Sequence, residues 1–139
     1  MSLRKNPRII VDTSVLISFY VYPSGIVRKI IEEAESEKCL LGVSEAILEE
    51  FRKVLSRKFE WDEELIIRTI GQIRRKFHVA SPAEKLEVVK ADPSDNKIIE
   101  AAAGFDADYI ISGDSHLLDI GRYKNIKIIK ASDLLKLLK

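Results

Sequence analysis

The chain has 139 residues, of which 46% are hydrophobic and 32% charged, and this composition predicts one globular domain with a substantial core. A formal net charge of +1 gives no basis for inferring nucleic-acid binding from overall charge, although an acidic cluster can cancel basic residues elsewhere. The single cysteine, Cys39, excludes an internal disulfide. Because the chain cannot form an internal disulfide, we expect a cytoplasmic protein, and because it has neither a signal peptide nor a bilayer-length apolar run, we expect that it does not cross a membrane.

The first half of the chain alternates between strand-like and helix-like patterns. After a short basic tail at residues 1–7, we expect a strand at 8–11 and then, at 15–20, either a helix or further extended chain. A helix at 26–37, a strand at 39–43 and a helix from Ser44 to about Arg57 follow. The next helix, 63–76, places Leu65, Ile66, Ile70 and Ile73 inward.

The second half continues the same alternation. We expect a strand at 77–79, local pairing at 86–89, a helix at 92–104 capped by Asp92, and a buried strand at 109–111. A short helical turn around 117–118 precedes a last strand at 126–129 and a terminal helix capped by Ser132-Asp133. This order predicts an α/β layered domain, covering 8–139, with a mostly parallel sheet.

Three acidic residues occupy positions where such folds carry their sites. Asp12 and Asp114 each follow a predicted strand, and ligands bind outside the carboxyl ends of parallel strands. Asp95 lies on the apolar stripe of its helix with Ile98 and Ile99, and it reaches the same edge only if the chain folds that helix back.

Helical phase selects a fourth acid. In the helix ending near Arg57, Glu49 falls on the polar side, whereas Glu50 lies beside Ile47 and Val54 on the flank of the apolar stripe. Each acid also has an ordinary structural explanation when taken alone: the aspartates as caps or turn residues, and Glu50 as a surface partner of Arg57 or Lys53.

A convergence of these carboxylates predicts a divalent cation. Crowded carboxylates repel one another, so one must take up a proton unless a cation compensates the charge. A ligand set made only of oxygen suits Mg²⁺ or Mn²⁺ better than zinc, and Mg²⁺ usually shares its coordination with substrate phosphate. The substrate class indicated is therefore a phosphodiester or a phosphate ester.

Four segments together resemble a known family. They are Val-Asp-Thr-Ser-Val-Leu-Ile-Ser at 11–18, Leu-Glu-Glu-Phe at 48–51, Asp-Pro-Ser-Asp-Asn at 92–96, and Ala-Asp-Tyr-Ile-Ile-Ser-Gly-Asp-Ser-His-Leu-Leu at 107–118. Their order is similar to that of PIN domains, in particular the VapC-like ribonucleases described as toxins of toxin–antitoxin pairs. The resemblance spans about residues 8–135.

The resemblance implies a three-layer α/β/α fold and a Mg²⁺- or Mn²⁺-dependent endoribonuclease. Carried over by motif, Asp12, Glu50, Asp95 and Asp114 are the metal-binding and catalytic residues, with Ser14 and Ser112 in support, although Thr is commoner than Ser at position 112. The family also implies an RNA substrate, an antitoxin protein as partner, and frequent homodimers. His116 is more simply a surface turn residue, and we assign no Lys or Arg to RNA.

Two other functional classes stay open at this point. A haloacid-dehalogenase-like phosphatase has an acid after its first strand, but it needs a second aspartate two residues later, where this chain has Ser14. A non-catalytic PIN-like module for RNA binding or regulation retains the fold without turnover. Cleavage of RNA, hydrolysis of a phosphomonoester, or ion binding without turnover would separate the three classes.

Overall fold

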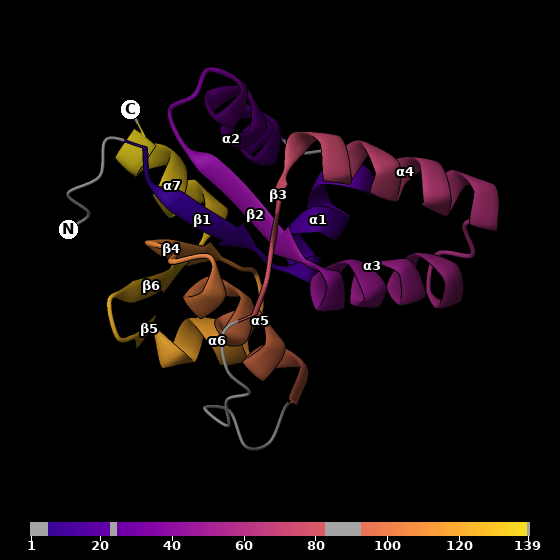
Figure 1. Ribbon diagram of the computed structural model, residues 1–139. Coiled ribbons are helices and arrows are strands. Elements are labelled where there is room, and N and C mark those ends of the chain that lie inside the picture. Colours follow the sequence, from indigo (N-terminus) through magenta and orange to yellow (C-terminus); the bar gives the residue numbers. More distant parts are fainter. Residues whose placement is uncertain (1–5, 23–24, 83–92, 139) are drawn as a thin grey trace.

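A computed structural model describes residues 6–22, 25–82 and 93–138 of the chain (Figure 1). Its strands are β1 Arg8–Val11, β2 Leu40–Ser44, β3 His78–Ala80, β4 Tyr109–Ile111, β5 Arg122–Tyr123 and β6 Ile126–Ile129. Its helices are α1 Thr13–Tyr20, α2 Gly25–Glu35, α3 Glu45–Arg57, α4 Glu63–Lys76, α5 Pro93–Gly104, α6 Ser115–Ile120 and α7 Ala131–Leu138.

The strands form one six-stranded sheet in the order β3-β2-β1-β4-β6-β5. Every neighbouring pair is parallel except β5 with β6, so the prediction of an α/β domain with a mostly parallel sheet is confirmed. The chain moves outward from β1 in one direction through β2 and β3, and in the other through β4 and β6. The order therefore reverses between β1 and β4, which is where α/β sheets open a crevice.

Helices pack on the faces of the sheet to give the expected layers (Figure 1). Helix α5 contacts β1, β2, β3 and β4, whereas α2 packs against α7 and α1. Helices α3 and α4 pack side by side and extend together away from the sheet. No single helix among the described residues is long and apolar enough to cross a membrane; α1 and α2 pass that test only when taken together, across a bend of 101°.

Most predicted elements are confirmed, and segment 15–20 is helical as part of α1. Two details were wrong. Leu65 is 38% exposed, because the inward stripe of α4 runs through Ile66, Thr69 and Ile73, and the Thr69 hydroxyl is satisfied by the Leu65 carbonyl at 2.9 Å. Ser132-Asp133 does not cap α7, because the helix already begins at Ala131.

Other predictions were incomplete or fall outside the described part of the chain. Strand β5 has only two residues, too few to give a hydrophobic period, and was not predicted. The Asp92 cap, the pairing at 86–89 and the first five residues of the predicted tail lie outside the described residues. In the leucine-rich terminal helix, Leu134 is buried within the chain, whereas Leu137 is exposed. Of these two leucines, only Leu137 is available to contact a second copy, and the homodimer stays a prediction.

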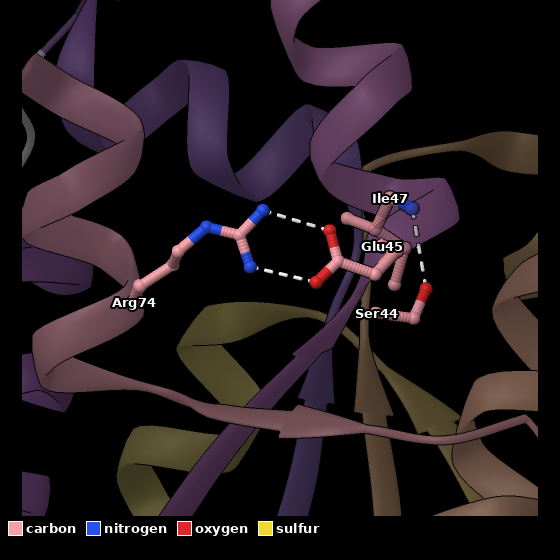
Figure 2. Close-up of polar contacts among 4 residues, drawn as sticks. All are labelled: Ser44, Glu45, Ile47 and Arg74. Carbon is pink, nitrogen blue, oxygen red and sulfur yellow. Dashed lines mark hydrogen bonds and ion pairs between the residues drawn. The ribbon is translucent and has the colours of Figure 1, made fainter. Parts of the chain in front are cut away.

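A bidentate ion pair joins α3 to α4 (Figure 2). The Arg74 guanidinium donates to both carboxylate oxygens of Glu45 at 2.6 and 2.7 Å, and this lowers the pKa of the Glu45 carboxyl. Ser44 caps the same end of α3 by accepting from the Ile47 N–H at 3.2 Å. Because both groups are largely exposed, the pair contributes below about 1 kcal/mol, but it fixes the first turn of the helix that carries Glu50.

Phe105 is held between Arg8 and Gly42. The Arg8 guanidinium carbon lies 4.1 Å from the ring centroid, and its Nε donates to the Phe105 carbonyl at 2.7 Å. On β2, a Cβ added to Gly42 would come within 2.8 Å of the ring. Gly42 is therefore needed for the close approach of the turn after α5 to the central strands.

We predict opposite effects for two glycine substitutions. Gly42→Ala drives a methyl group into the confined ring of Phe105 and should lower the free energy of unfolding by roughly 1–3 kcal/mol. Gly71→Ala, inside α4 where an added Cβ meets nothing within 4 Å, should raise it by about 0.5–1 kcal/mol. Urea denaturation of both variants checks this, and equal effects would refute the packing role of Gly42.

Candidate active site

The register of the sheet brings the first and last predicted acids together. Val11 of β1 pairs with Ile111 of β4, so the residues that follow, Asp12 and Ser112, are also neighbours. The Asp12 N–H continues the ladder by donating to the Ile111 carbonyl at 3.2 Å. Asp114 is two residues further along the chain, so it also lies near the end of β1, where the strand order reverses.

Asp12 is a buried carboxylate, 3% exposed, with both oxygens engaged. Its Oδ1 accepts from the Ser14 hydroxyl at 2.7 Å and from the Val15 N–H at 3.0 Å, which makes it the N-cap of α1. Its Oδ2 accepts from the Ser112 hydroxyl. Burial raises the pKa of Asp12, these hydrogen bonds lower it in part, and the nearby charge of Asp114 raises it further.

Two serine hydroxyls connect Asp12 to the loop after β4. Ser112 Oγ, which donates to Asp12, accepts from the Asp114 N–H at 2.9 Å, and Ser14 Oγ accepts from the Gly113 N–H at 3.0 Å. Asp114 itself caps α6 by accepting from the His116 N–H at 2.8 Å. The two serines therefore fix the loop that carries Asp114 relative to Asp12.

Glu49 and Glu50 have different surroundings on α3. Glu49 is exposed and pairs with Arg52 at 2.6 Å, so it lies on the solvent side as its helical phase predicts. Glu50 is half-buried, and one of its carboxylate oxygens accepts from the Thr13 hydroxyl at 2.7 Å. Thr13 follows Asp12 directly, so this bond orients Glu50 towards the end of β1.

The fold also brings Asp95 to this edge of the sheet. Asp95 lies in the first turn of α5 and is 5% exposed. One cavity of about 430 Å³ is lined by all four predicted acids, Asp12, Glu50, Asp95 and Asp114. The walls of that cavity also include Thr13, Ser14, Ile17, Tyr22, Val54, Lys58, Phe59, Ile98 and Leu117.

His116 forms a group with two of the four acids, Asp95 and Asp114 but not Asp12 or Glu50, and the sequence did not predict it. Ligand atoms of Asp95, Asp114 and His116 lie within 4.8 Å of one another, one atom from each residue. The only signal in the sequence was that His116 stands two residues after Asp114, a spacing that surface turns share. Asp114 and His116 are close because Asp114 caps the short helix α6 on which His116 lies, and Asp95 reaches them from the first turn of α5.

The donor set fits a hard divalent cation. Four carboxylates from four segments face one cavity, and one of them, Asp12, is buried with a raised pKa. A cation beside Asp12 would offset the burial and the Asp114 charge that raise this pKa. Carboxylate oxygens are the ligands of hard divalent cations, and an imidazole is a ligand of divalent transition metals.

We predict a pH dependence of stability that originates at Asp12. Because its pKa is raised in the folded protein, Asp12 contributes stability below its unfolded pKa, and that contribution is lost as the pH rises through the folded pKa. In a chelator, Asp12→Asn should therefore lose less stability than the wild type as the pH rises above about 4, the ordinary pKa of an aspartate. Thermal unfolding across that range measures the difference.

The same variant tests the cation. At a metal concentration one hundred times the dissociation constant, Mn²⁺ should stabilise the wild type by about 2.7 kcal/mol, on the order of 10 °C in melting temperature. Asp12→Asn should show little of this rise, and Glu49→Gln, on the exposed side of α3, should show all of it. An equal rise in Asp12→Asn would remove Asp12 from the binding site.

Comparison with known proteins identifies the family. Residues 8–116 match the model of the PIN domain family, so the chain belongs to the PIN domain proteins. It is also 32% identical over 117 residues to an uncharacterized protein, MJ1680, of Methanocaldococcus jannaschii, a match that covers 81% of this chain and 74% of the relative.

Two solved structures share the fold. VapBC-1 from nontypeable Haemophilus influenzae matches with a TM-score of 0.65 at 18% identity, covering 90% of this chain and 98% of its own. Mycobacterium tuberculosis VapC20, described as a sarcin-ricin loop cleaving toxin, matches with a TM-score of 0.60 at 13% identity, covering 86% and 98%. These likenesses establish the VapC-like form of the fold.

Proposed function

We propose that this protein is a divalent-metal-dependent endoribonuclease that hydrolyses phosphodiester bonds in RNA, and that it acts as the toxin of a toxin–antitoxin pair in the cytoplasm. The observation that carries the proposal is the single cavity lined by Asp12, Glu50, Asp95 and Asp114, acids that come from four separate segments. Membership of the PIN family and the fold shared with the VapBC-1 and VapC20 proteins support it.

The chain's own residues prepare the site for a cation and a water molecule. Asp12, Asp95 and Asp114 would hold Mg²⁺ or Mn²⁺, with Glu50 as a further ligand or as the group that orients the attacking water. When bound, the metal lowers the pKa of that water and neutralises charge developing on the scissile phosphate. Thr13 holds Glu50 in place, and Ser14 and Ser112 hold Asp12.

The partner and the substrate of this chain are inferred from the structures that share its fold. The Haemophilus structure is of a VapBC protein and the Mycobacterium one of a toxin that cleaves the sarcin-ricin loop. We propose that this chain likewise has an antitoxin protein as its partner and RNA as its substrate. A homodimer stays a prediction.

The alternative of a haloacid-dehalogenase-like phosphatase has no support in the site. Its second aspartate would stand at Ser14, whose hydroxyl instead donates to Asp12. The alternative of a non-catalytic module differs from the proposal only in turnover, so the decisive measurement is an activity assay.

We predict that the wild type cleaves single-stranded RNA with Mg²⁺ or Mn²⁺ and that Asp12→Asn and Asp114→Asn each reduce the rate at least about 100-fold. Asparagine also caps helices, so both variants should keep their helix starts and remain folded. Initial rates on a labelled RNA, with and without chelator, provide the measurement. Cleavage that survives chelation, or that is unchanged in both variants, would refute the proposal.

We predict a matched contrast on α3. Glu50→Gln should lower the cleavage rate strongly, and Thr13→Val, which removes the hydroxyl that holds Glu50, should lower it by roughly 10–100-fold. Glu49→Gln, one residue away but exposed and paired with Arg52, should leave the rate within about twofold of the wild type. Hydrolysis of a small phosphomonoester without RNA cleavage would favour the phosphatase instead.

A further inference from the structure

A second cavity adjoins the acidic one. It has a volume of about 480 Å³ and shares two lining residues, Ser14 and Tyr22, with the cavity of the four carboxylates. Its lining also includes Ser112 and Gly113, which belong to the loop that positions Asp114. A ligand held in the second cavity would therefore lie directly beside a group bound at the acids.

The two cavities differ in charge. The described lining of the second cavity contains no carboxylate; its polar groups are Lys130 and the hydroxyls of Ser14, Ser18, Ser112, Ser132 and Tyr22. Lys130 directly follows β6, is exposed, and forms no ion pair with any residue that the structure describes. The hydroxyls of Ser14, Ser18 and Ser112 already donate within the chain, to Asp12 or to the Ser14 carbonyl. Among the described lining, the Lys130 ammonium and the hydroxyls of Ser132 and Tyr22 are therefore the donors that suit an anionic, hydrogen-bonding ligand such as a nucleotide.

Tyr22 stands at the junction of the two cavities. Its side chain is 63% exposed, although large aromatic side chains are usually buried in a domain of this kind. Its ring makes an edge contact with Phe59, with the centroids 5.7 Å apart and the planes at 71°, so Phe59 supports the ring from one side. An exposed, supported aromatic ring is the kind of platform on which single-stranded bases stack.

We propose that the second cavity binds the nucleotide next to the scissile phosphate of single-stranded RNA, with Tyr22 stacking on its base and Lys130 binding its phosphate. This subsite rests on the proposed ribonuclease function, because it adjoins the acids at which cleavage would occur. In this proposal Tyr22 and Lys130 determine how tightly the RNA binds, and the acids carry out the hydrolysis.

Steady-state cleavage of a single-stranded RNA tests the subsite. Tyr22→Ala should raise KM about 10-fold and leave kcat within about threefold, and Tyr22→Phe should restore the wild-type value, since stacking needs the ring only. Lys130→Ala should also raise KM and should reduce the slope of log affinity against log salt by about 0.7, the value for one phosphate contact on a single strand. Lys136→Ala, on the outer part of α7 and outside both cavities, is the matched control and should change neither quantity.

A second readout separates this subsite from the nuclease activity. In the Asp114→Asn background, RNA carrying 2-aminopurine beside the cleavage site should lose fluorescence on binding when residue 22 is Tyr or Phe, and not in Tyr22→Ala. If the wild type cleaves RNA but none of these variants alters KM, salt slope or fluorescence, the subsite is refuted and the nuclease stands. If the wild type cleaves no RNA, the nuclease fails, and with it the place of the subsite beside a scissile phosphate; Tyr22-dependent quenching would then support only the binding of single-stranded RNA in the second cavity, and its absence would refute that binding too.

Discussion

The site depends on the burial of one carboxylate at the end of the central strand. Asp12 lies where β1 ends, between the two halves of the sheet, and almost none of its surface reaches solvent. Burial of a charge is costly unless hydrogen bonds or a counter-ion compensate it. Three donors from Ser14, Val15 and Ser112 compensate part of the cost, and a cation held with the other acids would compensate the rest.

Strand β4 and helices α3 and α5 place the other three acids near Asp12. Parallel pairing of β1 with β4 brings the loop of Asp114 beside Asp12, and α3 places Glu50 within reach of Thr13. Helix α5 crosses the strands so that its first turn, with Asp95, faces the same cavity. The ion pair between Glu45 and Arg74 joins α3 to α4 (Figure 2), and neither residue lines this cavity.

Much of this was predictable because local patterns in the sequence follow the geometry of the elements. The phase of α3 separated Glu50 from Glu49, and strand-end positions selected Asp12 and Asp114. Asp95 was different: its inward phase was visible, but its place at the shared edge depends on how α5 returns across the sheet, which is a tertiary property. The group of Asp95, Asp114 and His116 and the second cavity depend on contacts between elements, which no local pattern encodes. The stripe of α4 was assigned wrongly because it includes the polar Thr69, which a pattern of apolar residues does not select.

Two of the acids also begin helices, Asp12 for α1 and Asp114 for α6, and this dual use affects how the protein can change over evolutionary time. A single base change converts an aspartate codon to one for asparagine, and asparagine is among the best residues for starting a helix. A lineage can therefore discard the negative charge at either place and keep an intact, soundly folded chain. Loss of the charge at either place therefore need not entail loss of the architecture.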